Sequence, residues 1–424
     1  MATSDSLFDD PYDDSPLTGQ LGPLVSPTTA LAQLTSLPRP PRGIDGMPKH
    51  VRLHHLMRLV DLHLPSPEEG RLRQTIDLMV RQGYRHRDPR DARAWRVISG
   101  EFHPSGAALV PAPTAVAVGH SGVGKTQSIR RSLMAYPSQV ITHKSFPQMA
   151  AGHTQVLWQS IDVPPSGKST DLAASLMTAW DNSTGAERFR ASLGRQRPDG
   201  ARMLDEWRQV ANSHFLGILH LDEVQNFFKL SALKKRARRG GNEAAPELSI
   251  VEDACLKWLL VLINSWQIPV LFSGTPDGIG ALTRRFANAQ RLSTYGYHRL
   301  ERFERHDDRC FRQGLLPQLV AHQYVQNKLP LTDELAMLLI ELTAGIPRIM
   351  VALWIAAHRV AFGRKDDALT LKDLQTAAST YLAPVRPAVQ ALNSNSPDQM
   401  ARYEDLVPRD DAFWQRIWSV AEYQ

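Results

Sequence analysis

The chain has 424 residues, 42% of them hydrophobic and 22% charged, and a formal net charge of +6 at neutral pH. This composition is typical of a globular protein with one to three domains, and no apolar run approaches the roughly 18 residues that a membrane span requires. The acidic start "MATSDSLFDDPYDD" and two cysteines without CxxC spacing argue against a secretory signal, a zinc site and a disulfide framework, and favour the cytoplasm.

The first segment is predicted to be a flexible arm. Residues 1–48 are first acidic and then rich in Pro, Ser and Thr, a composition that disfavours a packed core. The first fourteen residues contain five Asp and no Lys or Arg, so the remainder of the chain carries +11. This excess is a modest indication of a polyanionic partner. Residues 49–110 are predicted to form a helical N-terminal extension, because "HVRLHHLMRLVDLHL" and "EGRLRQTIDLMVRQG" have helical periodicity.

Strands and helices alternate over residues 111–310. The runs "TAVAVG", "QVLWQSIDV", "FLGILHLDE" and "IPVLFSGT" are predicted strands, with helical patterns such as "STDLAASLMTAWDN" between them. This alternation predicts an α/β core in which helices cover both faces of a parallel sheet. Residues 311–384 contain only helical patterns and are predicted to form a small all-α lid. Residues 385–424 form a polar linker and a last segment, "DAFWQRIWSVAEYQ", which either packs on its own domain or docks on a partner.

A phosphate-binding loop is predicted directly after the first strand. The stretch "GHSGVGKT" fits the pattern G-x-x-x-x-G-K-S/T, known as Walker A. Its glycines let backbone N–H groups surround a phosphate, Lys125 would reach the β- and γ-phosphates of ATP, and the Thr126 hydroxyl would ligate Mg²⁺. The predicted nucleotide-binding residues are Gly119, His120, Ser121, Gly122, Val123, Gly124, Lys125, Thr126 and Gln127.

An acidic pair ends the strand "GILHLDE" and corresponds to Walker B. We expect Asp222 to complete the Mg²⁺ site with Thr126, and Glu223 to polarise the attacking water. A solvated acidic pair at a strand end is the alternative. The combination of loop and pair predicts a magnesium-dependent ATPase.

Further polar residues suggest the type of ATPase. Ser273 and Thr275 end the strand "IPVLFSGT", where a sensor of the γ-phosphate could lie, and Thr275 is our candidate. Arg348, in "TAGIPRIMVALWIAAHRVA", is predicted to reach from the lid over the phosphates. An α/β core followed by a helical lid is the AAA+ architecture, in which a neighbouring subunit commonly supplies an arginine finger. Candidates for the finger are Arg284, Arg285 and Arg291.

Taken together, these stretches resemble the TnsC/TniB family of AAA+ ATPases, which regulate DNA transposition. The similarity covers roughly residues 50–382 and also rests on "IDLMVRQGYRHRDP", "VLWQSIDVPPSGKSTDLAASLMTAWDNSTGAERF", "NAQRLSTYGYHRL" and "AGIPR". The third of these makes Arg291 our preferred finger, and the last matches the family's lid arginine. The chain departs from the family at "NSTGAERF" and in the long basic stretch that follows the acidic pair.

The resemblance implies a set of partners. It implies a bacterial protein that forms ATP-dependent rings or helical oligomers of itself around double-stranded DNA and associates with the nucleoid when bound. It further implies a bridge between a target selector of the TniQ or TnsD kind and a TnsB-like transposase, alone or with a TnsA-like protein. ATP hydrolysis would control disassembly and so the choice of target site.

DNA contacts are predicted on lysines and arginines that could follow a phosphate backbone without reading bases. Lys144 and Lys168 are placed after the first two core strands, where loops often face the channel of AAA+ assemblies. A solvated, mobile charge run is the alternative for the basic stretch. In the stretch "KLSALKKRARR" the basic residues are Lys229, Lys234, Lys235, Arg236, Arg238 and Arg239, the first four of which are our candidates.

Two other functions share part of this pattern. An origin-recognition or helicase-loading AAA+ ATPase has both motifs but normally a winged-helix domain after the lid, for which the roughly forty residues after Leu382 are expected to be too few. A scaffold that uses the nucleotide as a switch would predict helical repeats beyond the lid, and the sequence has no visible repeat.

Overall fold

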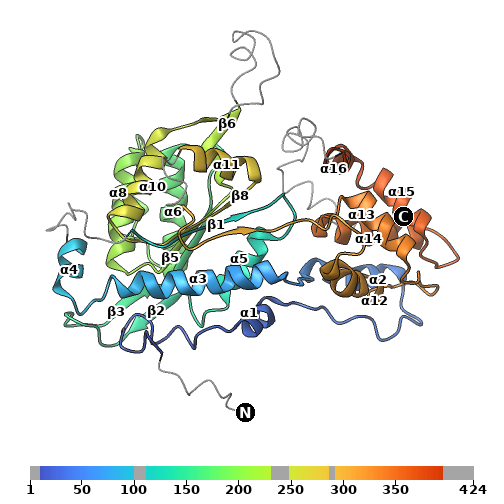
Figure 1. The fold of residues 1–424 in the computed structure, drawn as a ribbon, viewed down its shortest axis with the longest axis horizontal. Helices are drawn as coiled ribbons and strands as arrows, with labels where there is room; N and C mark the ends of the chain where they lie inside the picture. The colour runs from blue at the N-terminus through green and yellow to red at the C-terminus, as the bar shows by residue number, and fades with distance from the viewer. Residues whose placement is uncertain (1–9, 100–110, 231–247, 286–291, 395–424) are drawn as a thin grey trace, which may run out of the picture. The chain divides into compact units, whose positions relative to one another are not determined.

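The computed structural model describes residues 10–99, 111–230, 248–285 and 292–394 (Figure 1). The chain forms two compact units, and each unit is discontinuous in sequence. Of the described residues, the first unit contains 10–34, 67–99, 111–120, 125–230, 248–285 and 292–300, and the second contains 35–66, 121–124 and 301–394.

The first unit is built on a sheet of five parallel strands in the order β4-β5-β8-β1-β9. Parallel strands place their carboxyl ends at one edge of the sheet, and this is where the predicted phosphate loop and acidic pair begin. The strands are β1 (Thr114–Val118), β4 (Trp158–Asp162), β5 (Ile218–Asp222), β8 (Val270–Gly274) and β9 (Gly296–Arg299).

Helices flank this sheet. On one face α6 (Ser169–Thr184), α8 (Gly200–Ser213) and α10 (Asp253–Asn264) share a buried cluster with alternate strand residues such as Leu221 and Phe272. The helices α3 (Pro67–Arg85) and α5 (Lys125–Met134) also contact the sheet, through β1, β8 and β9. The predicted parallel sheet with flanking helices is therefore confirmed. The smaller elements are α4 (Ala92–Ile98), α7 (Arg190–Leu193), η3 (Val224–Phe227) and α11 (Pro276–Arg285).

The strand predicted from "QVLWQSIDV" is two strands. Its first part belongs to β3 (His153–Val156), which pairs antiparallel with β2 (Val140–His143), and its second part is β4. The chain changes partner at Leu157, whose N–H donates to Gln139 O while its C=O accepts from Ile218 N–H. A second antiparallel pair joins β6 (Phe228–Leu230) to β7 (Leu248–Ile250).

The described part of the predicted flexible arm is packed rather than free. Residues 10–34 belong to the first unit and include α1 (Pro27–Leu34), which contacts α3. Leu17 and Leu34 are fully buried, and the Arg81 side chain of α3 donates to Gly22 O at 2.7 Å. A few apolar residues among the prolines thus give this segment a core contact that its composition does not indicate.

The second unit is helical in its described residues, as predicted for the lid. Its core surrounds α14 (Pro347–Phe362), whose Trp354 is fully buried. Among the described residues no single helix is long and apolar enough to span a membrane, although α13 (Asp333–Thr343) and α14 together have the necessary length and composition and are bent by 112° at their junction. The other elements are α2 (Lys49–Leu56), η2 (Met57–Asp61), the π-helical turn η5 (Phe311–Leu315), α12 (Leu316–Ala321), α13 (Asp333–Thr343), α15 (Leu371–Ser379), η6 (Ala383–Val385) and α16 (Arg386–Asn393).

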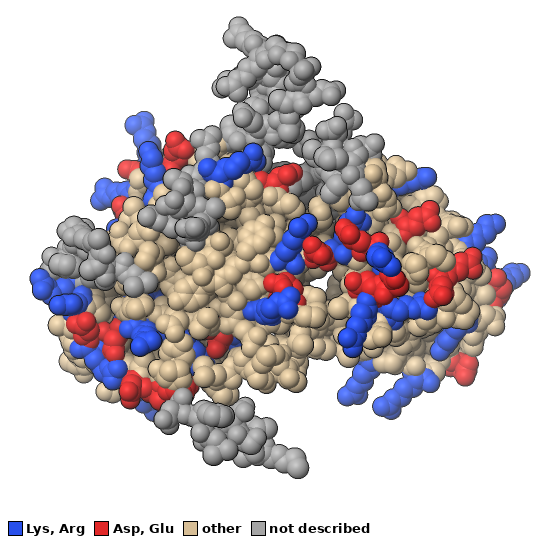
Figure 2. All heavy atoms as spheres, viewed as in Figure 1, with Lys and Arg blue, Asp and Glu red and all other residues tan. Residues whose placement is uncertain are grey.

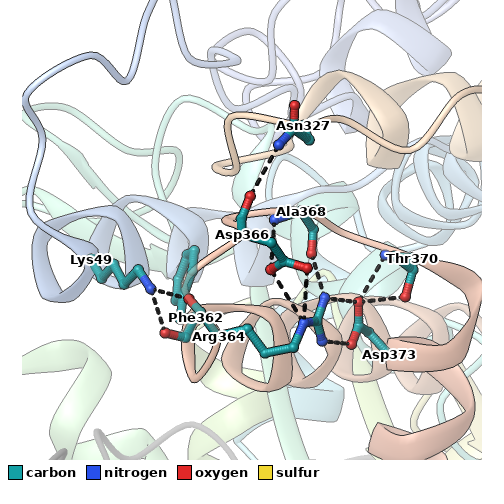
Figure 3. A network of polar contacts seen from close by, with 8 residues as sticks. All are labelled: Lys49, Asn327, Phe362, Arg364, Asp366, Ala368, Thr370 and Asp373. Atoms are coloured by element: carbon teal, nitrogen blue, oxygen red, sulfur yellow. Dashed lines mark hydrogen bonds and ion pairs between the residues drawn. The ribbon is translucent and has the colours of Figure 1, made fainter.

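The structure divides the predicted N-terminal extension between the units, because α2 and η2 pack in the second while α3 and α4 pack in the first. Figure 3 shows how α2 is attached: the Lys49 ammonium donates to Phe362 O at 2.7 Å and to Arg364 O at 2.6 Å. These carbonyls end α14, where a cation is favourable. Arg364 in turn pairs with Asp373, the carboxylate of the capping box that begins α15.

Candidate functional site

The phosphate loop lies between β1 and α5. Lys125, the first residue of α5, is buried, and its ammonium donates to Gly119 O at 2.7 Å and His120 O at 3.1 Å. These carbonyls belong to the loop itself, so the loop curves around the Lys125 ammonium. The Gln127 side chain is exposed on the same helix, and with its amide turned it accepts from Arg131 Nε at 3.1 Å.

The middle of the loop, residues 121–124, groups with the second unit. Gly122 has a φ of +86°, which a side chain would strain, and an added Cβ would lie 2.9 Å from Ile346 Cγ2. Its carbonyl accepts from Arg348 N–H at 3.3 Å. The predicted lid arginine, the second residue of α14, therefore lies beside residues 121–124 of the same unit, with its side chain exposed.

The turn that places Arg348 depends on Gly345. This residue has a φ of +70°, and a Cβ there would lie 1.7 Å from Phe303 O. We expect Gly345→Ala to destabilise the protein by about 3 kcal/mol or more, because it adds a left-handed strain to a backbone clash. Thermal unfolding measures the loss. Gly314→Ala is the control in the same unit, since its Cβ would meet only Leu64 at 3.8 Å. Equal stability of the two variants would contradict the prediction.

The acidic pair lies at the carboxyl end of β5. Asp222 is 1% exposed, and its Oδ2 accepts from the Thr126 hydroxyl at 2.5 Å. The two predicted metal ligands are thus in contact. Burial would raise the pKa of Asp222, but His220, the hydroxyls of Ser273 and Thr126, and Lys125 lower it below its ordinary value. The carboxylate is therefore ionised at neutral pH.

Behind Asp222, a row of polar side chains crosses three strands. Ser273 Oγ of β8 donates to Asp222 Oδ1 at 2.5 Å, and His220 Nε2 of β5 lies 2.7 Å from Ser273 Oγ. His220 Nδ1 lies 2.8 Å from Ser160 Oγ of β4. Burial lowers the pKa of His220 to about 4, so the ring is neutral. Ser273 is fully buried within this row, which differs from the possible phosphate-sensing position expected for it.

Glu223 is held by a different set of contacts. It has a φ of 55°, an uncommon conformation for a residue with a side chain, and its carboxylate accepts from the Gln225 amide. Gln225 Oε1 accepts from Thr275 N–H at 3.3 Å, which links the acidic pair to the end of β8. Burial raises the pKa of Glu223, with Asp222 acting in the same direction and Lys125 against it. A carboxylate of raised pKa is suited to accept a proton.

Thr275 lies where the sequence predicts a sensor, but its hydroxyl is used locally. The residue is 8% exposed, and its Oγ1 accepts from Gly278 N–H at 3.5 Å at the start of α11. The role of Thr275 as a phosphate sensor stays a prediction. Gln225 and His220, by contrast, were missed by the sequence analysis. Each lies two residues from one member of the acidic pair, a position that alone does not indicate its contacts.

The predicted DNA contacts fall into two groups. Lys168 follows β4, the edge strand of the sheet, and is exposed at the start of α6. Lys144 is also exposed, but it follows β2, which in the described part of the chain forms a separate two-stranded sheet with β3, so its placement after a core strand was wrong. On the face drawn in Figure 2, Lys and Arg are interspersed with Asp and Glu, and a broad area carries neither.

The second group lies largely outside the described residues. Lys229 is in β6, whose backbone alone is described at this position. The finger candidate Arg284 is exposed on α11, where its Nε donates to Gly280 O at 3.1 Å, and Arg285 ends that helix. The positions outside the described residues are Lys234, Lys235, Arg236, Arg238, Arg239, Arg291 and the segment 395–424.

Comparison with known proteins supports the fold and the nucleotide site. The profile of a family described as "AAA domain" matches residues 111–282, which contain the phosphate loop and the acidic pair. The chain therefore has an AAA+ P-loop fold followed by a helical region, as predicted, and an AAA domain implies nucleotide binding. No curated protein matches.

Among solved structures, one of the ORC2 protein from Aeropyrum pernix, in its ADPNP–ADP complexes, matches with 13% identity and a TM-score of 0.38. The match covers 81% of this chain and 83% of that chain. At this level of similarity the comparison adds nothing to the assignment of function.

Proposed function

We propose that this protein is a magnesium-dependent ATPase whose nucleotide cycle controls DNA transposition. The observation that carries the ATPase assignment is the 2.5 Å contact between Thr126 Oγ1 and Asp222 Oδ2. A hydroxyl and an ionised carboxylate are the oxygen donors that Mg²⁺ prefers, so the residues present fit this ion. Bound there with ATP, Mg²⁺ would neutralise charge on the phosphates.

The chain's own residues have distinct parts in this proposal. Backbone N–H groups of residues 121–124 and the start of α5 bind phosphate oxygens, and Lys125 exchanges the loop carbonyls for the β- and γ-phosphates. Glu223 accepts a proton from the attacking water at its carboxylate, which the Gln225 amide orients. Arg348 reaches the phosphates from the start of α14, beside Gly122.

The assignment to transposition is supported by the resemblance to the TnsC/TniB family. Residues of the stretches that carry this resemblance contribute to the core and to a turn of this protein. In "QGYRHRDP", Tyr84 is fully buried. In "WDNSTGAERF", Asp181 accepts from Arg188 N–H and Phe189 N–H at 3.1 Å each, which shapes the turn after α6. The chain therefore forms a hydrogen-bonded turn at the stretch whose sequence departs from the family's pattern. We therefore propose ATP-dependent self-assembly on DNA, a transposase and a target selector as partners, and a bacterial cytoplasmic location.

Electron microscopy with a non-hydrolysable ATP analogue tests the proposal. With a DNA duplex of random sequence, we expect rings or helical filaments threaded by the duplex, and none without nucleotide. Lys125→Ala protein is the matched control and should not assemble. A nucleotide-bound monomer that ignores DNA would contradict the transposition proposal and favour a nucleotide-switch scaffold.

Binding to DNA should be electrostatic and independent of sequence. We expect Lys168→Glu to weaken binding equally for unrelated duplexes and to reduce the slope of log K against log salt by about 1, because one phosphate contact is lost. Fluorescence anisotropy over a range of salt concentrations measures both effects. Lys257→Glu, exposed on α10, is the control with the same charge change. If both variants bind equally well, Lys168 does not contact DNA.

A further inference from the structure

The polar row behind Asp222 follows from the register of the sheet. Ser160 of β4 lies opposite His220 of β5, and two residues on along β5 Asp222 points to the same face. On β8, Leu271 lies opposite His220, so Ser273 comes level with Asp222. Both His220 and Ser273 are fully buried. Burying the polar side chains of His220, Asp222 and Ser273 costs free energy unless each is hydrogen-bonded, and here each one is.

The hydrogen bond between Ser273 and Asp222 sets the direction of the next bond in the row. Ser273 Oγ donates its proton to Asp222 Oδ1. The Ser273 hydroxyl has no second proton, and therefore His220 Nε2 must be the donor to Ser273 Oγ. The other ring nitrogen, Nδ1, lies 2.8 Å from Ser160 Oγ. His220 thus fixes the direction in which the Ser273 hydroxyl points.

The same contacts divide the two oxygens of Asp222. Oδ1 accepts from Ser273 Oγ at 2.5 Å and from Glu223 N–H at 2.9 Å, while Oδ2 accepts from Thr126. One oxygen is therefore held by the protein interior, and the other faces the phosphate-loop helix. Oδ2 is therefore the oxygen on the side where Thr126 and Asp222 would share a cation.

We propose that His220 is a positioning residue for the metal ligand Asp222. His220 holds the Ser273 hydroxyl, which in turn fixes Asp222 Oδ1. The Asp222 side chain is therefore already in one rotamer, in which Oδ2 would be available to Mg²⁺. The proposal rests on the proposed Mg²⁺–ATP function and adds a residue to it. Partners of this kind behind a metal ligand typically change metal affinity by about 10- to 100-fold when removed.

The test is the Mg²⁺ concentration that half-saturates binding of a fluorescent ATP analogue, measured by titration. We expect His220→Ala to raise this concentration about 10-fold, as for other residues that orient metal ligands. His220→Gln, whose amide N–H can still donate to Ser273, should restore most of the loss. Ser160→Ala, one step further from the metal, should have a smaller effect than His220→Ala.

A second buried histidine provides the control for lost packing. His358 is fully buried in the second unit, with Nδ1 2.8 Å from Trp354 O. His358→Ala should lower the melting temperature but leave the Mg²⁺ dependence unchanged. If His220→Ala lowers the melting temperature in the same way and leaves the Mg²⁺ half-saturation at the wild-type value, the proposal is overturned and His220 is structural.

Two further outcomes keep the test decisive. If His220→Ala does not fold, His220→Phe fills the space without a donor and should show the same rise in the Mg²⁺ requirement. Wild-type protein whose ATP binding ignores Mg²⁺ would overturn the proposed function together with this inference. A wild-type response to Mg²⁺ that His220→Phe shares unchanged would overturn the inference alone.

Discussion

Lys125→Ala is expected to weaken ATP binding by about 100-fold and to abolish ATP-dependent assembly, because it removes the charged donor to two phosphates. The ammonium already lies within the loop, where it donates to Gly119 O and His120 O, and in the proposed complex it would exchange these carbonyls for phosphate oxygens. Equilibrium binding of a fluorescent ATP analogue measures the loss.

The loop itself must stay intact in this variant. Because the ammonium also ties two loop carbonyls together, the melting temperature of the nucleotide-free protein should be compared with that of the wild type. Arg130→Ala is the matched control: it lies on the same helix with its side chain 55% exposed, and its pair with Asp162 at 3.8 Å is a weak surface contact. Nucleotide affinity that survives in Lys125→Ala but falls in Arg130→Ala would refute the phosphate-loop assignment.

Glu223→Gln is expected to separate binding from hydrolysis. The amide cannot accept the proton of the attacking water, so turnover should fall by about 100-fold or more. Asp222, Thr126 and Lys125 are untouched, and ATP affinity should therefore stay close to that of the wild type. Single-turnover phosphate release measures the first quantity, and equilibrium binding measures the second. On DNA, this variant should give oligomers that persist after ATP is added.

Glu252→Gln is the control for the loss of a partly buried carboxylate in the same unit. The Glu252 carboxylate accepts from Ser169 N–H at the start of α6 and is not a member of the acidic pair. Its replacement should therefore leave turnover unchanged. If Glu223→Gln hydrolyses ATP at the wild-type rate, a different residue positions the water. The raised pKa of Glu223 would then reflect its burial and the nearby Asp222, and not a role as a base.

The chemistry at the strand ends could be predicted from sequence because it depends on short, continuous patterns. The stretch "GHSGVGKT" contains its own geometry: a strand, a turn of glycines and a helix. The contact between Thr126 and Asp222 followed from the rule that parallel strands end at one edge. The presence and type of most long elements were read correctly for the same reason.

The contacts that hold this site could not be predicted, because they depend on register between strands. His220 and Ser273 are 53 residues apart in the chain, and a shift of one residue in either strand would send one of them to the opposite face. In the sequence, "GILHLDE" is simply an apolar strand with one histidine. Gln225 is similar: its use is visible only once the end of β8 is placed beside it.

The attachment of Lys49 to the end of α14 has a consequence for how the protein is made. Lys49 and Phe362 are separated by 313 residues, so the second unit needs two parts of the chain that have most of the first unit between them. Residues 35–66 cannot complete their contacts until the residues after 300 have been synthesised. Closure of so long a loop is slow. The residues of the first unit are therefore synthesised before the last helices of the second unit, and a truncation that begins at Pro67 would remove the Lys49 ammonium from the end of α14.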